Sequence, residues 1–204
     1  MNAGSLSLRV TGPLAPLAGI LIGALGGAVY WLASQLWPSS VAVILAMAAT
    51  AHVTTAIPAA AAARFDVLAR VLLLFIKFNA LMALSAAKLP FAAPANFTLA
   101  LIMICGYAAS YALLVFVSAS GAKAAAPGIN PAALILALAV GFAPAALLGI
   151  PGLIGLAAAV ILGSSVMAFL KYKPMSASGD VLELTQLTTE ASFYLGALAS
   201  WRFV

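Results

Sequence analysis

The chain has 204 residues, of which 66% are hydrophobic and only 6% are charged, and its formal net charge is +5. A soluble domain carries about 25% charged residues. The 9 basic and 4 acidic side chains of this chain cannot cover a water-soluble fold of this size. The composition therefore excludes an ordinary soluble domain and indicates a protein whose main partner is the lipid bilayer. The basic excess is typical of anchoring at a membrane and gives no reason to expect nucleic acid as a partner.

Uncharged stretches, such as residues 11–50, are long enough for one or two spans of about 20 residues each. Their apolar residues run continuously and do not alternate, which favours helices over a membrane barrel. We predict an all-α polytopic membrane protein that forms one domain over residues 1–204. Residues 1–12 are expected to be a short cytoplasmic lead-in and not a cleaved signal. The seven predicted transmembrane helices are residues 13–37, 41–63, 67–87, 97–118, 132–150, 152–170 and 181–201.

Two features refine this arrangement. The join at residues 149–152 is short, so it connects either two antiparallel neighbouring spans or the arms of one re-entrant hairpin. With seven spans, one side of the membrane collects most of the basic residues, which predicts a cytoplasmic N-terminus and a periplasmic C-terminus in a bacterial inner membrane. That basic side holds Arg9, Arg64, Arg70, Lys123, Lys171 and Lys173, and the other side holds Lys88 and Arg202.

Glycine recurs every four residues in the first predicted helix, at Gly19, Gly23 and Gly27. Such a stripe lets a second helix approach closely. We expect it to pack against another helix of this chain, with a homodimer contact as the alternative.

Acidic residues gather at the start of the last predicted helix and within it, and Asp180, Glu183, Gln186 and Glu190 fall on one face. Acids inside a membrane are costly and are candidate functional residues. Asp180 and Glu183 are candidate ligands of Mg²⁺, which prefers carboxylate oxygens. The alternative for these two residues is helix capping. Glu190 lies too far inside the helix to be a capping residue.

Other polar residues in the predicted spans need partners or roles. Lys77 lies in the middle of the third span and must find an acid or reach the surface, and we expect it to pair with Glu190. Asn79 is a candidate for a hydrogen bond between helices. His52 is expected to hydrogen-bond between helices rather than to act as a catalyst. The single cysteine, Cys105, is expected to be a buried apolar side chain, and Asp66 to be a neutralised loop acid.

Three segments in this order resemble a known family. A glycine-rich first helix begins near residues 16–19, a run of leucines ends in Lys77 and Phe78, and Gly179-Asp180 precedes Glu190. Together they are similar to the cobalamin synthase family (adenosylcobinamide-GDP ribazoletransferase), integral-membrane enzymes of late cobalamin assembly. The resemblance implies transfer of a nucleotide-activated corrinoid onto α-ribazole with release of GMP, and it implies Mg²⁺ as cofactor. The candidate catalytic residues are therefore Asp180, Glu190, Lys77 and His52, which lie in the matching segments, together with Glu183 as a further acid of the last helix.

The chain departs from the family pattern where that chemistry is carried. The family has a histidine after its second helix, followed by several aspartates. Here His52 is followed by Thr54, Thr55, Pro58 and Ala61. Four acids in the whole chain cannot form the full aspartate cluster.

These departures predict a degenerate, non-catalytic member that acts as a subunit or scaffold of an inner-membrane complex. Its partners would be other membrane subunits or further copies of itself. One alternative is a divergent ribazoletransferase that requires Mg²⁺. The other is a small transporter or a pigment- or lipid-binding membrane protein with an unknown cofactor.

Overall fold

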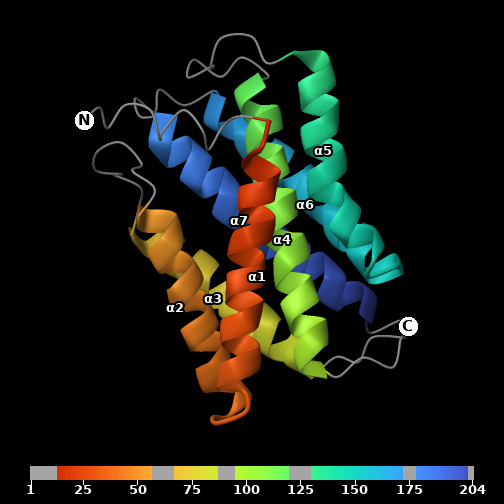
Figure 1. Cartoon of the computed structure of the whole chain (residues 1–204). Coiled ribbons are helices and arrows are strands. Elements are labelled where there is room, and N and C mark those ends of the chain that lie inside the picture. The colour runs from red at the N-terminus through yellow and green to blue at the C-terminus, as the bar shows by residue number, and fades with distance from the viewer. Residues whose placement is uncertain (1–12, 57–66, 87–94, 120–129, 172–177, 202–204) are drawn as a thin grey trace, which may run out of the picture.

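The computed structural model describes residues 13–56, 67–86, 95–119, 130–171 and 178–201, and all regular structure in these ranges is α-helical. The helices run alternately up and down one bundle (Figure 1). The all-α prediction is confirmed, and each described helix overlaps one predicted span. The helices are α1 (Ala15–Ala33), α2 (Ser39–Ala56), α3 (Val67–Ser85), α4 (Ala95–Ala119), α5 (Pro131–Ala146), α6 (Ile150–Lys171) and α7 (Ser178–Trp201). The predicted lead-in at residues 1–12 and Asp66 lie outside the described residues.

Among the described residues, three helices are long and apolar enough to cross a membrane. They are Ala15–Ala33 in α1, Leu68–Ser85 in α3 and Phe97–Ala119 in α4, with mean hydropathies of 1.7, 1.8 and 2.2. Shorter apolar helices cover Ser39–Thr54, Pro131–Ala146 and Ile150–Val166. The described structure therefore contains three candidate spans, where the sequence pattern predicted seven.

Helix α4 forms the centre of the bundle and contacts α1, α3, α5, α6 and α7. In α4, 78% of the apolar window is buried, compared with 44% in α1 and 22% in α3. Large apolar side chains cover the outside: Leu36 is 75% exposed, Leu21 is 70% exposed and Phe75 is 63% exposed. Two charged side chains lie inside the bundle, since Lys77 and Glu190 are both buried. Apolar side chains on the outside and charged side chains on the inside are unfavourable in water and favourable in the hydrocarbon of a bilayer.

The glycine stripe of α1 lies directly against the backbone of α4. A Cβ atom added to Gly19 would lie 2.6 Å from the carbonyl oxygen of Tyr107, and one added to Gly23 would lie 2.6 Å from the Cα of Ile104. One added to Gly27 would lie 2.7 Å from the Cβ of Ala100. The stripe therefore serves packing within this chain, as the first of the two interpretations expected.

Helices α5 and α6 are separate elements joined by a tight turn. Gly149 adopts a φ of 65°, a conformation that L side chains rarely adopt. A Cβ atom on Gly152 would lie only 2.0 Å from the carbonyl oxygen of Ala145, so the start of α6 packs directly on the end of α5. Beyond the turn the two helices have different main partners, because α5 packs chiefly on α4 and α6 chiefly on α7. The predicted antiparallel pairing is thus a minor contact between these two helices.

Candidate functional site: a buried polar cluster

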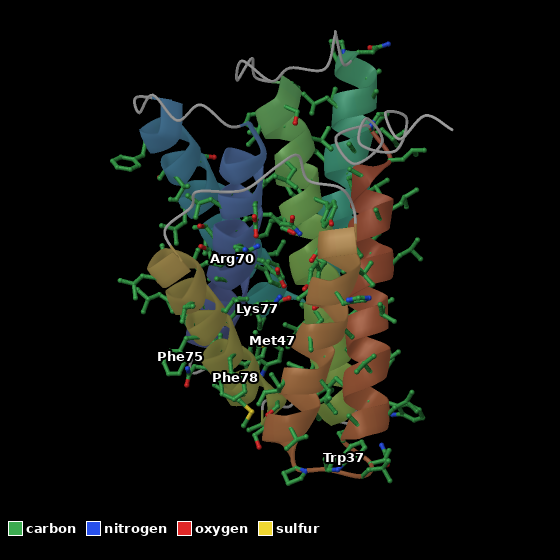
Figure 2. All side chains as sticks on the ribbon, turned by 90° about the vertical axis from the view of Figure 1, so that its left-hand side faces the viewer. Trp37, Met47, Arg70, Phe75, Lys77 and Phe78 are labelled. Carbon is green, nitrogen blue, oxygen red and sulfur yellow. The ribbon has the colours of Figure 1, made fainter. Side chains whose placement is uncertain are left out.

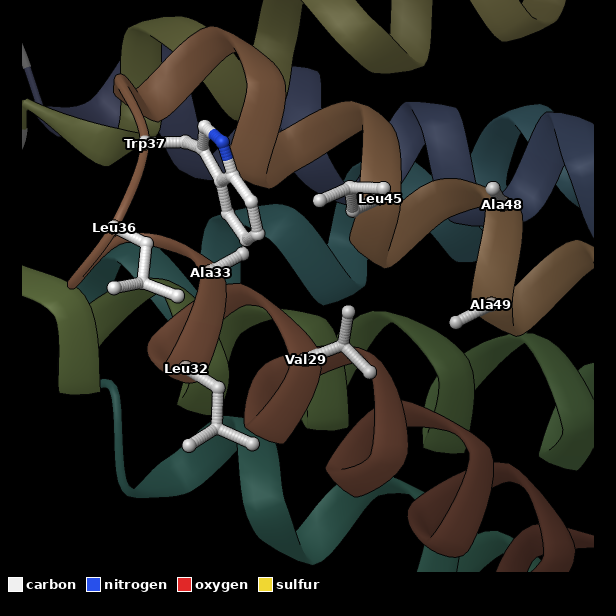
Figure 3. Close-up of a pocket in the computed structure, with 8 residues that line it drawn as sticks. All are labelled: Val29, Leu32, Ala33, Leu36, Trp37, Leu45, Ala48 and Ala49. Atoms are coloured by element: carbon white, nitrogen blue, oxygen red, sulfur yellow. The ribbon is translucent and has the colours of Figure 1, made fainter.

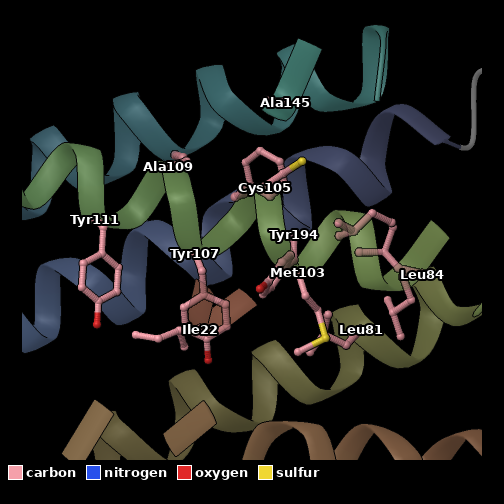
Figure 4. Packing of buried hydrophobic residues seen from close by; sticks show 14 of the residues in the cluster. Ile22, Leu81, Leu84, Met103, Cys105, Tyr107, Ala109, Tyr111, Ala145 and Tyr194 are labelled. Carbon is pink, nitrogen blue, oxygen red and sulfur yellow. The ribbon is translucent and has the colours of Figure 1, made fainter. Parts of the chain in front are cut away.

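The strongest candidate site is a cluster of buried polar side chains between α3, α4 and α7. Lys77 on α3 lies with its Nζ 2.6 Å from Oε1 of Glu190 on α7. The Nζ also donates a hydrogen bond of 2.8 Å to the hydroxyl of Tyr107 on α4. Tyr194, one turn after Glu190, donates a hydrogen bond of 2.8 Å to the same carboxylate oxygen. The pairing expected between Lys77 and Glu190 is therefore present. Figure 2 labels Lys77, and Figure 4 labels the two tyrosines of the cluster, Tyr107 and Tyr194.

Burial makes these charges energetically costly unless other groups satisfy them. Glu190 is 1% exposed and Lys77 is 4% exposed, so neither charge reaches the outside of the bundle. An isolated charge in such a place costs several kcal/mol, and a buried pair is tolerated only when further hydrogen bonds satisfy it. Two tyrosine hydroxyls supply those bonds here. Lys77 contacts both Glu190 of α7 and Tyr107 of α4, so the cluster connects α3 to these two helices.

Small and polar neighbours shape the space around the cluster. Gly106 on α4 leaves room for the Tyr194 ring, since a Cβ atom on Gly106 would lie 2.5 Å from that ring's Cε1. Thr50 on α2 is a hydrogen-bond neighbour of Tyr107. The Thr50 hydroxyl also donates to the carbonyl oxygens of Ala46 and Met47 within its own helix. The second predicted span thus contributes a threonine to the cluster.

Polar contacts continue from the cluster toward the start of α7. Tyr111, one turn after Tyr107 on α4, is hydrogen-bonded to Gln186. At the start of α3, the Arg70 guanidinium forms an ion pair with Glu183. Both side chains of this pair are partly exposed, at 43% and 31% respectively. Since residues three or four apart share a helix face, α7 presents one polar face to α3 and α4.

Two of the candidate residues in α7 differ from the sequence expectation. The helix begins at Ser178, so Asp180 lies inside its first turn and not at the N-cap position. The Asp180 side chain lies outside the described part of the structure. Glu183, expected as a metal ligand or a capping residue, gives its carboxylate to Arg70 instead. The capping box expected from the sequence, with Asp180 as N-cap and Glu183 three residues later, does not match a helix that begins at Ser178.

His52 is not part of the cluster, because it lies on the exposed face of α2. Within the described residues, no group of three or more histidine, cysteine or acidic side chains could hold a metal ion. Cys105 is buried, as expected. The structure thus brings together two of the five candidate catalytic residues, Lys77 and Glu190.

Sequence reasoning missed the tyrosines. A tyrosine hydroxyl buried in an apolar helix needs a hydrogen-bond partner, and Tyr107, Tyr111 and Tyr194 all lie in predicted spans. The spacing of four residues between Glu190 and Tyr194, and between Tyr107 and Tyr111, was the available signal. The ion pair between Arg70 and Glu183 was also missed, because Arg70 is interpreted as a basic residue of the cytoplasmic side and Glu183 as a metal ligand or a capping residue.

A groove lies on the outside of the bundle, between α1 and α2 (Figure 3). Its volume is about 480 Å³. The indole nitrogen of Trp37 is the only polar side-chain atom in its lining, so the groove offers contact to apolar groups and no catalytic chemistry. It is lined by Val29, Leu32, Ala33, Leu36, Trp37, Leu45, Ala48 and Ala49.

Comparisons with known proteins add no further assignment: no family model, no curated protein and no solved structure matches this chain. The resemblance to the cobalamin synthase family therefore depends on the sequence segments alone.

Proposed function

We propose that this protein is a non-catalytic helical subunit or scaffold embedded in a bacterial inner membrane, derived from a cobalamin-synthase-like ancestor. All seven helices would cross the membrane, with the N-terminus in the cytoplasm and the C-terminus in the periplasm. Three helices already have the length and hydropathy for this. The basic residues Arg9, Arg64 and Lys123 would then lie on the cytoplasmic side, as the positive-inside rule requires.

One observation supports the scaffold function over catalysis. Lys77 and Glu190, the buried charged residues of the described structure, form an ion pair with each other. They also form hydrogen bonds with the hydroxyls of Tyr107 and Tyr194. Glu183 is likewise committed to Arg70. A general base or a phosphate-binding lysine must instead present a free group to a substrate. In this chain the same residue types hold helices together.

The catalytic alternative is tested directly. Purified protein in mild detergent is supplied with Mg²⁺, adenosylcobinamide-GDP and α-ribazole, and released GMP is measured. We expect no release above a protein-free control. GMP release that Asp180→Ala abolishes, in a variant that still folds, would show that the chain is a divergent transferase.

The scaffold function has its own positive test. The double variant Lys77→Met, Glu190→Leu removes both charges while it keeps most of the side-chain volume. Well-packed apolar replacements of a buried ion pair are often tolerated. We expect the double variant to co-purify from native membranes with the same membrane partners, at the same stoichiometry, as the wild type. Loss of those partners from a correctly folded double variant would show that the charges themselves are functional.

A further inference from the structure

The outer face of α3 carries a polar side chain in an otherwise apolar stripe. Of the three candidate spans, α3 is the least buried, with 22% of its window inside the bundle. Asn79 lies on the exposed side of this helix, near its middle. Its neighbours there are apolar, because Phe75 is 63% exposed and Leu72 is 51% exposed. Residues spaced by three or four positions form this stripe, namely Leu68, Leu72, Phe75, Asn79, Ala83 and Ala86.

The Asn79 amide is only partly satisfied within the described structure. Its Nδ2 donates a hydrogen bond of 2.8 Å to the carbonyl oxygen of Phe75 in the same helix. That bond uses one of the two N–H groups of the amide, so the exposed side chain keeps its Oδ1 acceptor and its second N–H available. In hydrocarbon no water is present to satisfy them, so an exposed amide in a span favours contact with another polar group.

We propose that this face of α3 is the contact between two copies of this chain, with Asn79 of each copy hydrogen-bonded to Asn79 of the other. An asparagine amide is both donor and acceptor, so two copies related by a two-fold axis satisfy each other reciprocally. A different partner would need its own polar group placed at the same depth. The axis lies along the membrane normal, which makes the two α3 helices parallel and brings equivalent residues together.

The neighbouring side chains fit such a contact. Ala83 and Ala86 continue the stripe after Asn79, and small residues let two membrane helices approach closely. A single polar residue within an apolar seam is also the arrangement that fixes register in helix pairs. The inference rests on the membrane embedding of the proposed function and adds a second copy of the chain as the first partner.

Dimerisation is measured by single-molecule photobleaching in lipid vesicles over a range of protein-to-lipid ratios. We expect the wild type to dimerise and Asn79→Leu to weaken the dimer about threefold to tenfold. Ser165→Ala is the matched control, because Ser165 is an exposed polar residue of α6 that also bonds its own helix, at Ile161. This control should leave the dimer unchanged. A wild type that stays monomeric at every ratio, or a dimer that Asn79→Leu does not weaken, would overturn the proposal.

Cross-linking gives a second readout that leaves Asn79 intact. In a Cys105→Ala background, a single cysteine at Ala83 should form a disulfide between copies in native membranes. A cysteine at Ala139, on the exposed face of α5, should not. The reverse pattern would overturn the proposal. Retention of the protein in carbonate-washed membranes reports the embedding separately, so failure of the dimer is distinguishable from failure of the proposed function.

Discussion

Two interfaces of the central helix α4 are held by different physical means. On the α1 side, Gly19, Gly23 and Gly27 bring two helix backbones into direct contact, and the interface contains no charge. On the α3 and α7 side, a buried ion pair and two tyrosine hydroxyls connect the helices. The first interface depends on close packing, which any added atom disturbs. The second depends on satisfied charges, which the loss of one partner disturbs.

The largest effect is expected when the ion pair loses one member. Lys77→Met leaves Glu190 charged, buried and without its cation, which should cost about 3–5 kcal/mol of stability. The free energy of unfolding in lipid or detergent measures this loss.

Arg70→Met is the matched control for that loss. It removes the cation of the other ion pair, but Arg70 and Glu183 are partly exposed. Its cost should therefore stay at or below about 1 kcal/mol. Equal losses in the two variants would show that burial does not distinguish the two pairs.

A smaller loss is expected at the glycine interface. Gly23→Val places its first carbon 2.6 Å from the Cα of Ile104, which is backbone and cannot rotate away. Helix α1 must therefore shift, at a cost of about 1–3 kcal/mol. Ala24→Val, on the exposed face of the same helix, should change the stability little. An unfolding free energy that is the same in both variants would mean that α1 does not pack on α4 through this stripe.

The smallest effect has the opposite sign and lies between α6 and α7. The Thr189 hydroxyl is fully buried next to Gly163 and has no hydrogen-bond partner in the described structure. Thr189→Val keeps the shape and removes the unsatisfied oxygen, so stability should be unchanged or higher by about 1 kcal/mol. A clear destabilisation would show that this hydroxyl has a partner. Thermal unfolding of the two proteins side by side decides the sign.

The sequence predicts the glycine interface more completely than the polar one. A repeat of every fourth residue identifies a packing face by itself, so Gly19, Gly23 and Gly27 were assigned correctly. The pairing of Lys77 with Glu190 was also predicted correctly, because an unpaired charge inside a span is unfavourable and each residue has few candidate partners. The tyrosines and Arg70 were not assigned, since their roles depend on which helices meet and at what height. Periodicity along one helix does not contain that information.

The number of membrane spans is a second feature that the sequence predicts only in part. Mean hydropathy and length identify α1, α3 and α4. Helix α7 carries Glu183 and Glu190, which the structure pairs with cations from α3. Hydropathy counts those acids as polar residues even where they are neutralised by a neighbour. The place of such a helix in the bundle is therefore recognised only once its partner is known.

The central claim is that Lys77 and Glu190 are a structural connection between helices, and exchange of their charges tests it most directly. In Lys77→Glu, Glu190→Lys the ion pair is retained with reversed polarity. Tyr107 and Tyr194 can still bond both groups, because a tyrosine hydroxyl is both donor and acceptor. We predict that the exchange recovers most of the stability that either single charge reversal loses. A double variant less stable than both single variants would contradict the account.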